Sequence, residues 1–113
     1  MHFSEIKLKV GLNEDKIPVD IKWMASDSDR GQFTDCKAFS LSIWDPTESN
    51  TLAINLWTED MQTDEMHSFY FRSLMQMTES YFRATKNPII KERMTDFVNQ
   101  VIKETSDWEN NKN

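Results

Sequence analysis

The sequence predicts an α+β fold in which a four-stranded antiparallel sheet is followed by a two-helix hairpin packed on one face of the sheet. Two observations support this prediction. Up to about Asp60 apolar residues alternate with polar ones, as in half-buried strands, and from Thr63 onward they recur every three or four residues, as in amphipathic helices. A chain of 113 residues suits one domain. We therefore expect a single domain over residues 1–113, with strands over about 4–58, helices over about 63–108 and a frayed tail at 109–113.

Two strands and a connecting loop open the predicted sheet. Apolar and polar residues alternate on both sides of a segment that contains Gly, Asn, Asp and Pro. The two strands and the loop are expected at residues 5–10, 19–24 and 11–18. Pairing the strands through Val10 and Val19 aligns their apolar side chains. The same register puts Lys7 opposite Lys22, and like charges at facing positions are unfavourable.

The apolar pattern of the third and fourth strands predicts the register in which they pair. The third is expected over Phe33 to Trp44, and the fourth contains Leu52, Ile54 and Leu56, after a turn at 45–50. One register brings three apolar pairs onto one face: Ile43 with Leu52, Leu41 with Ile54, and Phe39 with Leu56. Cys36 and Ala38 lie on the opposite phase, which predicts a bulge or a strand start near Lys37.

Two helices follow. Thr63 and the acids after it form a favourable helix start, and this helix is expected to run to about Ala84. Asn87 as cap and Pro88 at the first helical position begin the second helix. The expected core residues are Met66, Phe69, Tyr70, Leu74, Met77 and Tyr81 of the first helix and Ile90, Met94, Phe97, Val98, Val101, Ile102 and Thr105 of the second. Phe71, Met75 and Phe82 widen the apolar arc of the first helix, which leaves open an intersubunit role for it.

Composition excludes several classes of function. The net charge of −6 and the scattered basic residues argue against binding to nucleic acid, whose phosphates require a basic patch. No signal peptide or membrane-spanning run is visible, so we expect no membrane insertion and a cytoplasmic location. The one cysteine excludes an intramolecular disulfide and suits a reducing compartment.

No residue cluster predicts catalysis, a cofactor or a bound metal. His67 has no second histidine nearby in the sequence, so an ordinary surface role is favoured over metal binding. Cys36 lacks a motif that would activate its thiol. The segment Asp27-Ser28-Asp29 resembles the opening of a calcium loop but lacks the later ligands. We therefore predict that the protein is not an enzyme.

The predicted outer face of the sheet carries the strongest binding signal. Trp44 and Trp57 lie on that face among small and polar side chains, and Met24 lies on the same side of its own strand. Trp and Met are enriched at protein interfaces. We predict these three residues as a partner-binding or self-association surface. The alternative is that the chain ends or the loop 26–32 cover this face.

Several of these segments resemble the gliding-motility-associated GldC family of Bacteroidota. The resemblance covers roughly Ser4 to Phe97. It is carried by residues 4–10, Leu41-Ser42-Ile43-Trp44-Asp45-Pro46, Asn50-Thr51-Leu52, Leu56-Trp57-Thr58-Glu59-Asp60-Met61 and Asp64-Glu65-Met66. It implies a small, soluble, non-catalytic accessory protein of the gliding machinery that acts through protein partners, with no catalytic residue to transfer.

Two alternatives to this function remain open. The order of strands and then helices is similar to that of the export chaperone SecB, which favours a holdase with apolar grooves and pairing between protomers as the second interpretation. Formation of a homo-oligomer is compatible with both interpretations. A small metal-binding protein or enzyme is the alternative from another class, and the lack of convergent polar residues disfavours it.

Overall fold

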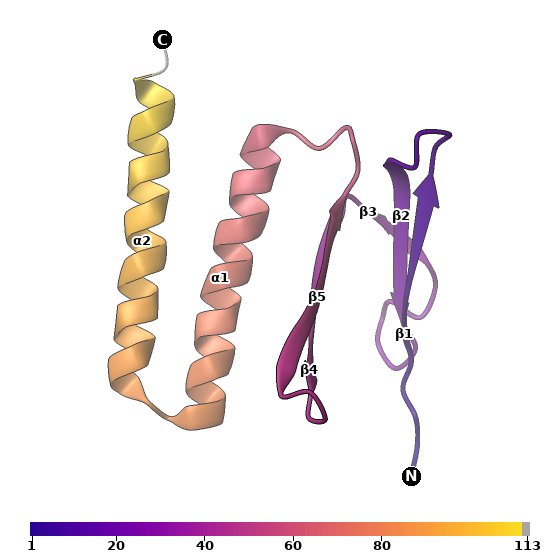
Figure 1. Ribbon diagram of the computed structural model, residues 1–113, viewed down its shortest axis with the longest axis horizontal. Helices are drawn as coiled ribbons and strands as arrows, with labels where there is room; N and C mark the ends of the chain where they lie inside the picture. Colours follow the sequence, from indigo (N-terminus) through magenta and orange to yellow (C-terminus); the bar gives the residue numbers. More distant parts are fainter. Residues whose placement is uncertain (112–113) are drawn as a thin grey trace. The chain divides into compact units, whose positions relative to one another are not determined.

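The computed structural model describes residues 1–111. The chain forms two compact units: Met1–Gln62 contains the strands, and the unit that begins at Thr63 contains the helices. The elements, shown in Figure 1, are β1 (Ile6–Leu12), β2 (Pro18–Ala25), β3 (Thr34–Cys36), β4 (Ala38–Asp45), β5 (Asn50–Trp57), α1 (Thr63–Thr85) and α2 (Pro88–Asn110). This order confirms the α+β class.

The strands form two sheets, so the prediction of one four-stranded sheet was wrong. β1, β2 and β3 make a three-stranded antiparallel sheet, and β4 and β5 make a two-stranded one. The predicted third strand is divided at Lys37, where the reversal of apolar phase indicated an irregularity. Its first piece pairs with β2 and its second with β5. One continuous stretch thus has two different neighbours, and the ladder cannot continue as a single sheet.

The register of the β4–β5 hairpin agrees with the predicted one. The three apolar pairs Ile43 with Leu52, Leu41 with Ile54 and Phe39 with Leu56 face each other across the two strands. The Asp45 carboxylate accepts a 2.9 Å hydrogen bond from the Thr47 amide in the connecting turn. An Asp side chain that bonds the backbone two residues on is a common way to fix such a turn.

The predicted register of β1 and β2 was wrong by two residues. Val10 lies opposite Ile21 instead of Val19. The connecting loop is tighter than expected: the Asn13 side chain accepts hydrogen bonds from the Asp15 and Ile17 amides, at 2.9 and 3.1 Å. A register shift at the end of β1, between residues 11 and 12, accompanies this turn. The turn and the shift set the pairing, which the apolar pattern alone left ambiguous.

Both helices follow the predicted boundaries closely. α1 begins at Thr63, and α2 begins at Pro88 with Asn87 as its cap. The Asn87 side chain accepts hydrogen bonds from the Ile89 and Ile90 amides, each at 3.2 Å, which satisfies two of the free donors at the helix start. α2 extends to Asn110, into the stretch 109–113 where fraying was expected, and residues 112–113 of that stretch lie outside the described part of the chain.

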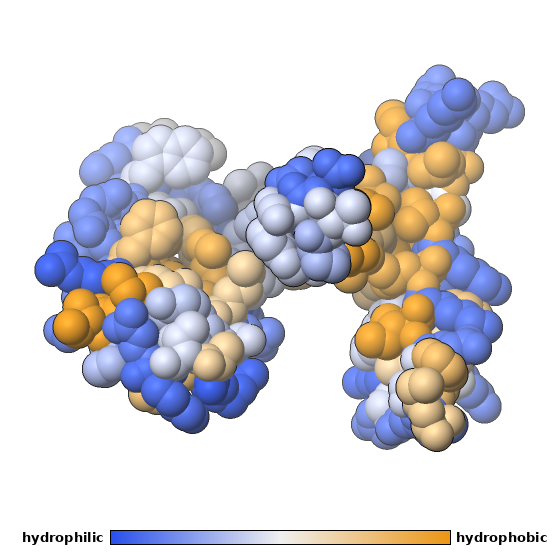
Figure 2. Space-filling model, turned by 60° about the horizontal axis from the view of Figure 1, so that its bottom comes forward, coloured by the Kyte–Doolittle hydropathy of each residue, from blue (hydrophilic) through white to orange (hydrophobic). Residues whose placement is uncertain are grey.

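Few side chains are fully buried. Ile21 and Val98 are the buried apolar residues of the described chain, and Thr58 and Thr78 are its buried polar ones. The hairpin face that was expected to be sealed has Leu41, Ile43, Leu52 and Ile54 between 37% and 53% exposed. Hydrophobic surface is accordingly visible on the outside of the molecule in Figure 2. The packing of the helices on a sheet face stays a prediction.

Candidate partner-binding site

The two predicted tryptophans share one face of the β4–β5 hairpin but lie at its opposite ends. Trp44 faces Thr51, next to the turn, and Trp57 faces Ala38, at the open end. Both side chains are exposed, at 62% and 47%. Ala38 and Trp44 are six positions apart along β4, which corresponds to about 20 Å. The two indoles are therefore separate contact points.

Small and polar residues occupy the face between the tryptophans. The Ser40 hydroxyl donates a 2.6 Å hydrogen bond to the Asn55 side chain across the strands, and Ser42 faces Ala53. None of these side chains is large enough to cover its neighbours. The hairpin thus presents a flat centre with one bulky aromatic group at each end.

Met24 belongs to the other sheet. It lies on β2 opposite Lys7 and is half-buried. The expectation of one sheet placed Met24 beside the tryptophans. Because Met24 pairs within β1–β2–β3 and not with the hairpin, strand pairing does not join it to Trp44 or Trp57.

A hollow lies beside Trp57. It has a volume of about 330 Å³ and is lined by Ile17, Pro18, Asn55, Leu56, Trp57 and Glu59. The Glu59 amide donates a 3.1 Å hydrogen bond to the Pro18 carbonyl, which holds the start of β2 close to the end of β5. The hollow offers an apolar recess next to an exposed indole, a combination that suits a side chain from a partner.

The buried Thr58 joins the two sheets at this point, and the sequence reading missed it. Its amide donates a 2.8 Å hydrogen bond to the Lys37 carbonyl, between β3 and β4. Its hydroxyl donates a 2.6 Å hydrogen bond to the Asp60 carboxylate. This bond, helped by the charge of Lys37, holds the pKa of Asp60 below its usual value. Thr58 is thus a structural residue next to Trp57.

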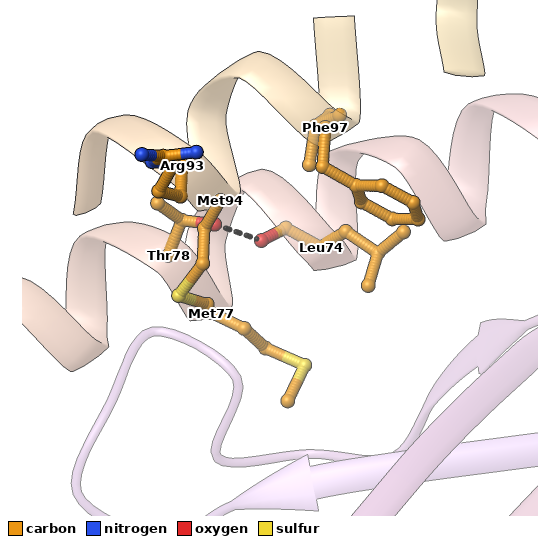
Figure 3. Close-up of a pocket in the computed structure, with 7 residues that line it drawn as sticks. Leu74, Met77, Thr78, Arg93, Met94 and Phe97 are labelled. Carbon is orange, nitrogen blue, oxygen red and sulfur yellow. Dashed lines mark hydrogen bonds between the residues drawn. The ribbon is translucent and has the colours of Figure 1, made fainter. Parts of the chain in front are cut away.

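The helical unit has a groove of its own between α1 and α2 (Figure 3). Its volume is about 330 Å³, and it is lined by Leu74, Met77, Thr78, Arg93, Met94, Phe97 and Val98. Met77 and Phe97, expected in the core, are each 57% exposed. The buried Thr78 hydroxyl bonds the Leu74 carbonyl at 2.9 Å, so it adds no free polar group to the groove.

The aromatic arc of α1 makes contacts inside the helical unit. Phe71 stacks on His67 with ring centroids 5.8 Å apart. The Lys91 ammonium lies 4.6 Å from the centre of the Phe82 ring, and that of Lys86 lies 5.8 Å from it. These rings, expected to widen the free apolar arc, are half-buried. The exposed apolar surface of the helical unit includes the groove residues Met77 and Phe97.

The comparison with protein families gives a match. The family described as gliding motility-associated protein GldC-like matches residues 18–107, most of the 113-residue chain. The chain belongs to the GldC-like family. The range that matches this family contains Met24, Trp44 and Trp57 and both helix starts, whereas the resembling segment at residues 4–10 lies outside it. No curated protein and no solved structure matches the chain.

The structure also places the remaining candidate residues. Partial burial raises the pKa of the Cys36 thiol, which disfavours the reactive thiolate. His67 lies 3.9 Å from the Glu109 carboxylate. Asp27 accepts hydrogen bonds from Ser4 and His2 near the chain start. Within residues 1–111, no three His, Cys, Asp or Glu side chains are grouped as a metal site.

Neither helix can span a bilayer. Over the part of the chain that the structure describes, no helix combines the length and the apolar character that a membrane crossing needs.

Proposed function

We propose that this protein is a non-catalytic accessory component of gliding motility that acts by binding another protein. Membership of the GldC-like family, over residues 18–107, is the observation on which the proposal depends. The hairpin supports a binding role, because its strands carry no charged residue from Ala38 to Trp44 or from Asn50 to Trp57 and two exposed tryptophans lie on it. Charged residues are depleted and tryptophan is enriched at the centre of protein interfaces.

Trp57 is the proposed anchor of this interface. It combines an exposed indole with the neighbouring apolar hollow. Trp44 lies beside the turn and does not line either of the hollows described above. The exposure of the opposite, aliphatic face means that burial does not distinguish the two faces of the hairpin. The choice of the tryptophan face rests on residue type and on the hollow, not on exposure.

Substitution of the anchor tests the proposal. Trp57→Ala should weaken binding to the partner by about 2 kcal/mol or more, since truncated aromatic anchors typically cost that much. The matched control is Trp108→Ala, a tryptophan of similar exposure (53%) on α2. The partner is first captured from the native organism with the wild-type protein, and its affinity for each variant is then measured by calorimetry. Equal affinities for the two variants would contradict the assignment.

We propose a cytoplasmic location for this function. The single cysteine is free, as expected of a protein in a reducing compartment. Cell fractionation with an antibody against the protein tests the location. Recovery of the protein outside the cytoplasmic fraction would exclude it.

The groove of the helical unit favours a second candidate function, a holdase for unfolded chains. Methionine side chains adapt to many shapes, and Met77 and Met94 both line this groove. Under this alternative the protein should suppress the aggregation of an unfolded client, measured by light scattering. Met77→Ser should weaken that activity, and Ile89→Ser, at an exposed site outside the groove, should not. A dedicated accessory protein should show no suppression.

A further inference from the structure

The outer edge of β4 is an unprotected strand edge. The hydrogen bond from the Thr58 amide to the Lys37 carbonyl belongs to the same register as the β4–β5 ladder. Because bonded and non-bonded pairs alternate in an antiparallel ladder, the odd-numbered residues of β4 direct their backbone groups toward β5. The even-numbered residues direct theirs away from the hairpin. In the described sheets β5 is the one strand that pairs with β4, so these outward groups have no strand neighbour.

The outer edges of β1 and β5, in contrast, carry features that discourage pairing with another chain. β1 carries Lys7 and Lys9, and lysines on an edge strand discourage pairing with another chain. The outer edge of β5 is occupied at its end, where the Glu59 amide bonds Pro18. β4 has neither lysine nor proline, and its residues from Ala38 to Trp44 are all uncharged. The outer edge of β4 therefore has none of the features that discourage pairing with another strand on the edges of β1 and β5.

We propose that β4 pairs with β4 of a second copy of this chain, antiparallel and across a two-fold axis at Leu41. In this register Leu41 faces Leu41 of the second copy and Phe39 faces Ile43. The outward-directed residues of each β4 then take part in hydrogen-bonded pairs, and the Ala38 amide exchanges its bond to the Cys36 sulfur for one across the new pairing. The same patch of both chains is used, as two-fold symmetry requires.

Charge selects the same register. Asp45, at the end of β4, lies across from Lys37 of the second copy, so opposite charges meet at both ends of the pairing. A shift of two residues carries Asp45 past Lys37 to the level of β3, which pairs with β2, and loses this match. The other shift places Asp45 across from Phe39. The apolar pairing, the hydrogen-bond count and the charges therefore agree on one arrangement.

The proposed pairing joins the two hairpins into one larger sheet. A two-stranded sheet is marginally stable alone, and the pairing turns two such sheets into one of four strands. It also places Trp44 of one copy next to Ala38 of the other, and Ala38 faces Trp57 within its own chain. Two tryptophans that are distant within one chain then flank one small residue. This inference goes beyond the proposed function and does not depend on it.

The first test is the molar mass of the purified full-length protein. Sedimentation equilibrium at protein concentrations up to about 100 µM should give twice the 13.4 kDa of one chain, or an even multiple. A monomer over the whole concentration range would overturn the proposal.

Cross-linking tests the register itself. In a Cys36→Ala background, Leu41→Cys should form a disulfide with its own copy, since facing non-hydrogen-bonded residues lie about 4.5 Å apart between their Cα atoms. The matched control, Ile43→Cys, is on the same face but lies about 13 Å from its own copy in this register. We expect at least about tenfold more covalent dimer for Leu41→Cys under mild oxidation. Equal yields, or a higher yield for Ile43→Cys, would overturn the register.

A second pair of variants keeps the edges apart. Ser42 and Ala53 face each other, and both direct their amides away from the hairpin, so proline at either position removes no bond of the β4–β5 ladder. Ser42→Pro should give a monomer, and Ala53→Pro should remain a dimer. The reverse result would assign the interface to β5 and overturn the proposal. A dimer for both variants would overturn it as well.

Discussion

The two sheets of this protein differ in how they use charge. In β1–β2–β3 the Lys22 ammonium lies 2.5 Å from the Asp35 carboxylate and 3.4 Å from that of Asp20. The hydrogen bond to Asp35 is the main reason that the pKa of Lys22 is raised. The Lys9 ammonium lies 4.2 Å from the centre of the Phe33 ring. In the hairpin, Asp45 at the end of β4 is the one charged residue of the two strands. A hydrogen bond between the uncharged side chains of Ser40 and Asn55 links the strands.

The sheets also differ in what they bury. Ile21, which pairs with Val10 on one side and with Cys36 on the other, is 1% exposed. In the hairpin each strand has one neighbour, and its aliphatic side chains remain about half exposed. The three-stranded sheet thus contains a buried apolar residue, and its β1 edge carries two lysines. The hairpin has the composition of an interior strand pair and the exposure of a surface.

The largest expected effect comes from truncating one isoleucine in each sheet. Ile21→Ala should lower the free energy of unfolding by about 3 kcal/mol, as for other buried large-to-small changes. Ile43→Ala, at a half-exposed site, should lower it by less than about 1.5 kcal/mol. Urea unfolding at low protein concentration, where self-association is negligible, measures both. An equal loss for both variants would mean that the hairpin face is covered in solution and would remove the contrast between the sheets.

A smaller effect should follow when the edge of β1 loses its charges. The double variant Lys7→Gln/Lys9→Gln should self-associate more readily, by about tenfold in concentration, because the lysines no longer oppose edge pairing. The control Lys86→Gln/Lys103→Gln removes the same charge, and Lys86, like Lys9, lies over an aromatic ring. Light scattering against concentration compares the two. Equal behaviour would show that net charge, and not the edge, governs association.

The smallest expected effect concerns the two turns. Lys16 and Ser49 have positive φ angles of 61° and 50°, which glycine adopts without strain. Lys16→Gly and Ser49→Gly should each raise the free energy of unfolding by about 0.5 kcal/mol, less than the strain relieved because glycine also has more freedom in the unfolded chain. Denaturant unfolding is followed by a probe in each sheet. If Ser49→Gly changes nothing while Lys16→Gly stabilises, the hairpin opens independently of the three-stranded sheet.

The local structure could be predicted well from the sequence. The hairpin register followed from three apolar pairs, because a slip of one residue would turn all of them to the other face. The start of α2 followed from Asn87 and Pro88, whose cap and ring geometry act within one turn. The reversal of apolar phase at Cys36 and Ala38 located the break at Lys37. Family resemblance carried by residues 41–66 agreed with the match over residues 18–107.

Only the tertiary structure decided how these pieces combine. Alternation says which residues share a face but not which strand lies alongside, so the division of the strands into two sheets and the place of Met24 in a different sheet from Trp44 and Trp57 were not predictable. The register of β1 and β2 depended on the Asn13 turn, and the role of Thr58 depended on contacts with Lys37 and Asp60. Periodicity is a local property of the chain, whereas neighbours, edges and hollows arise from contacts between distant segments.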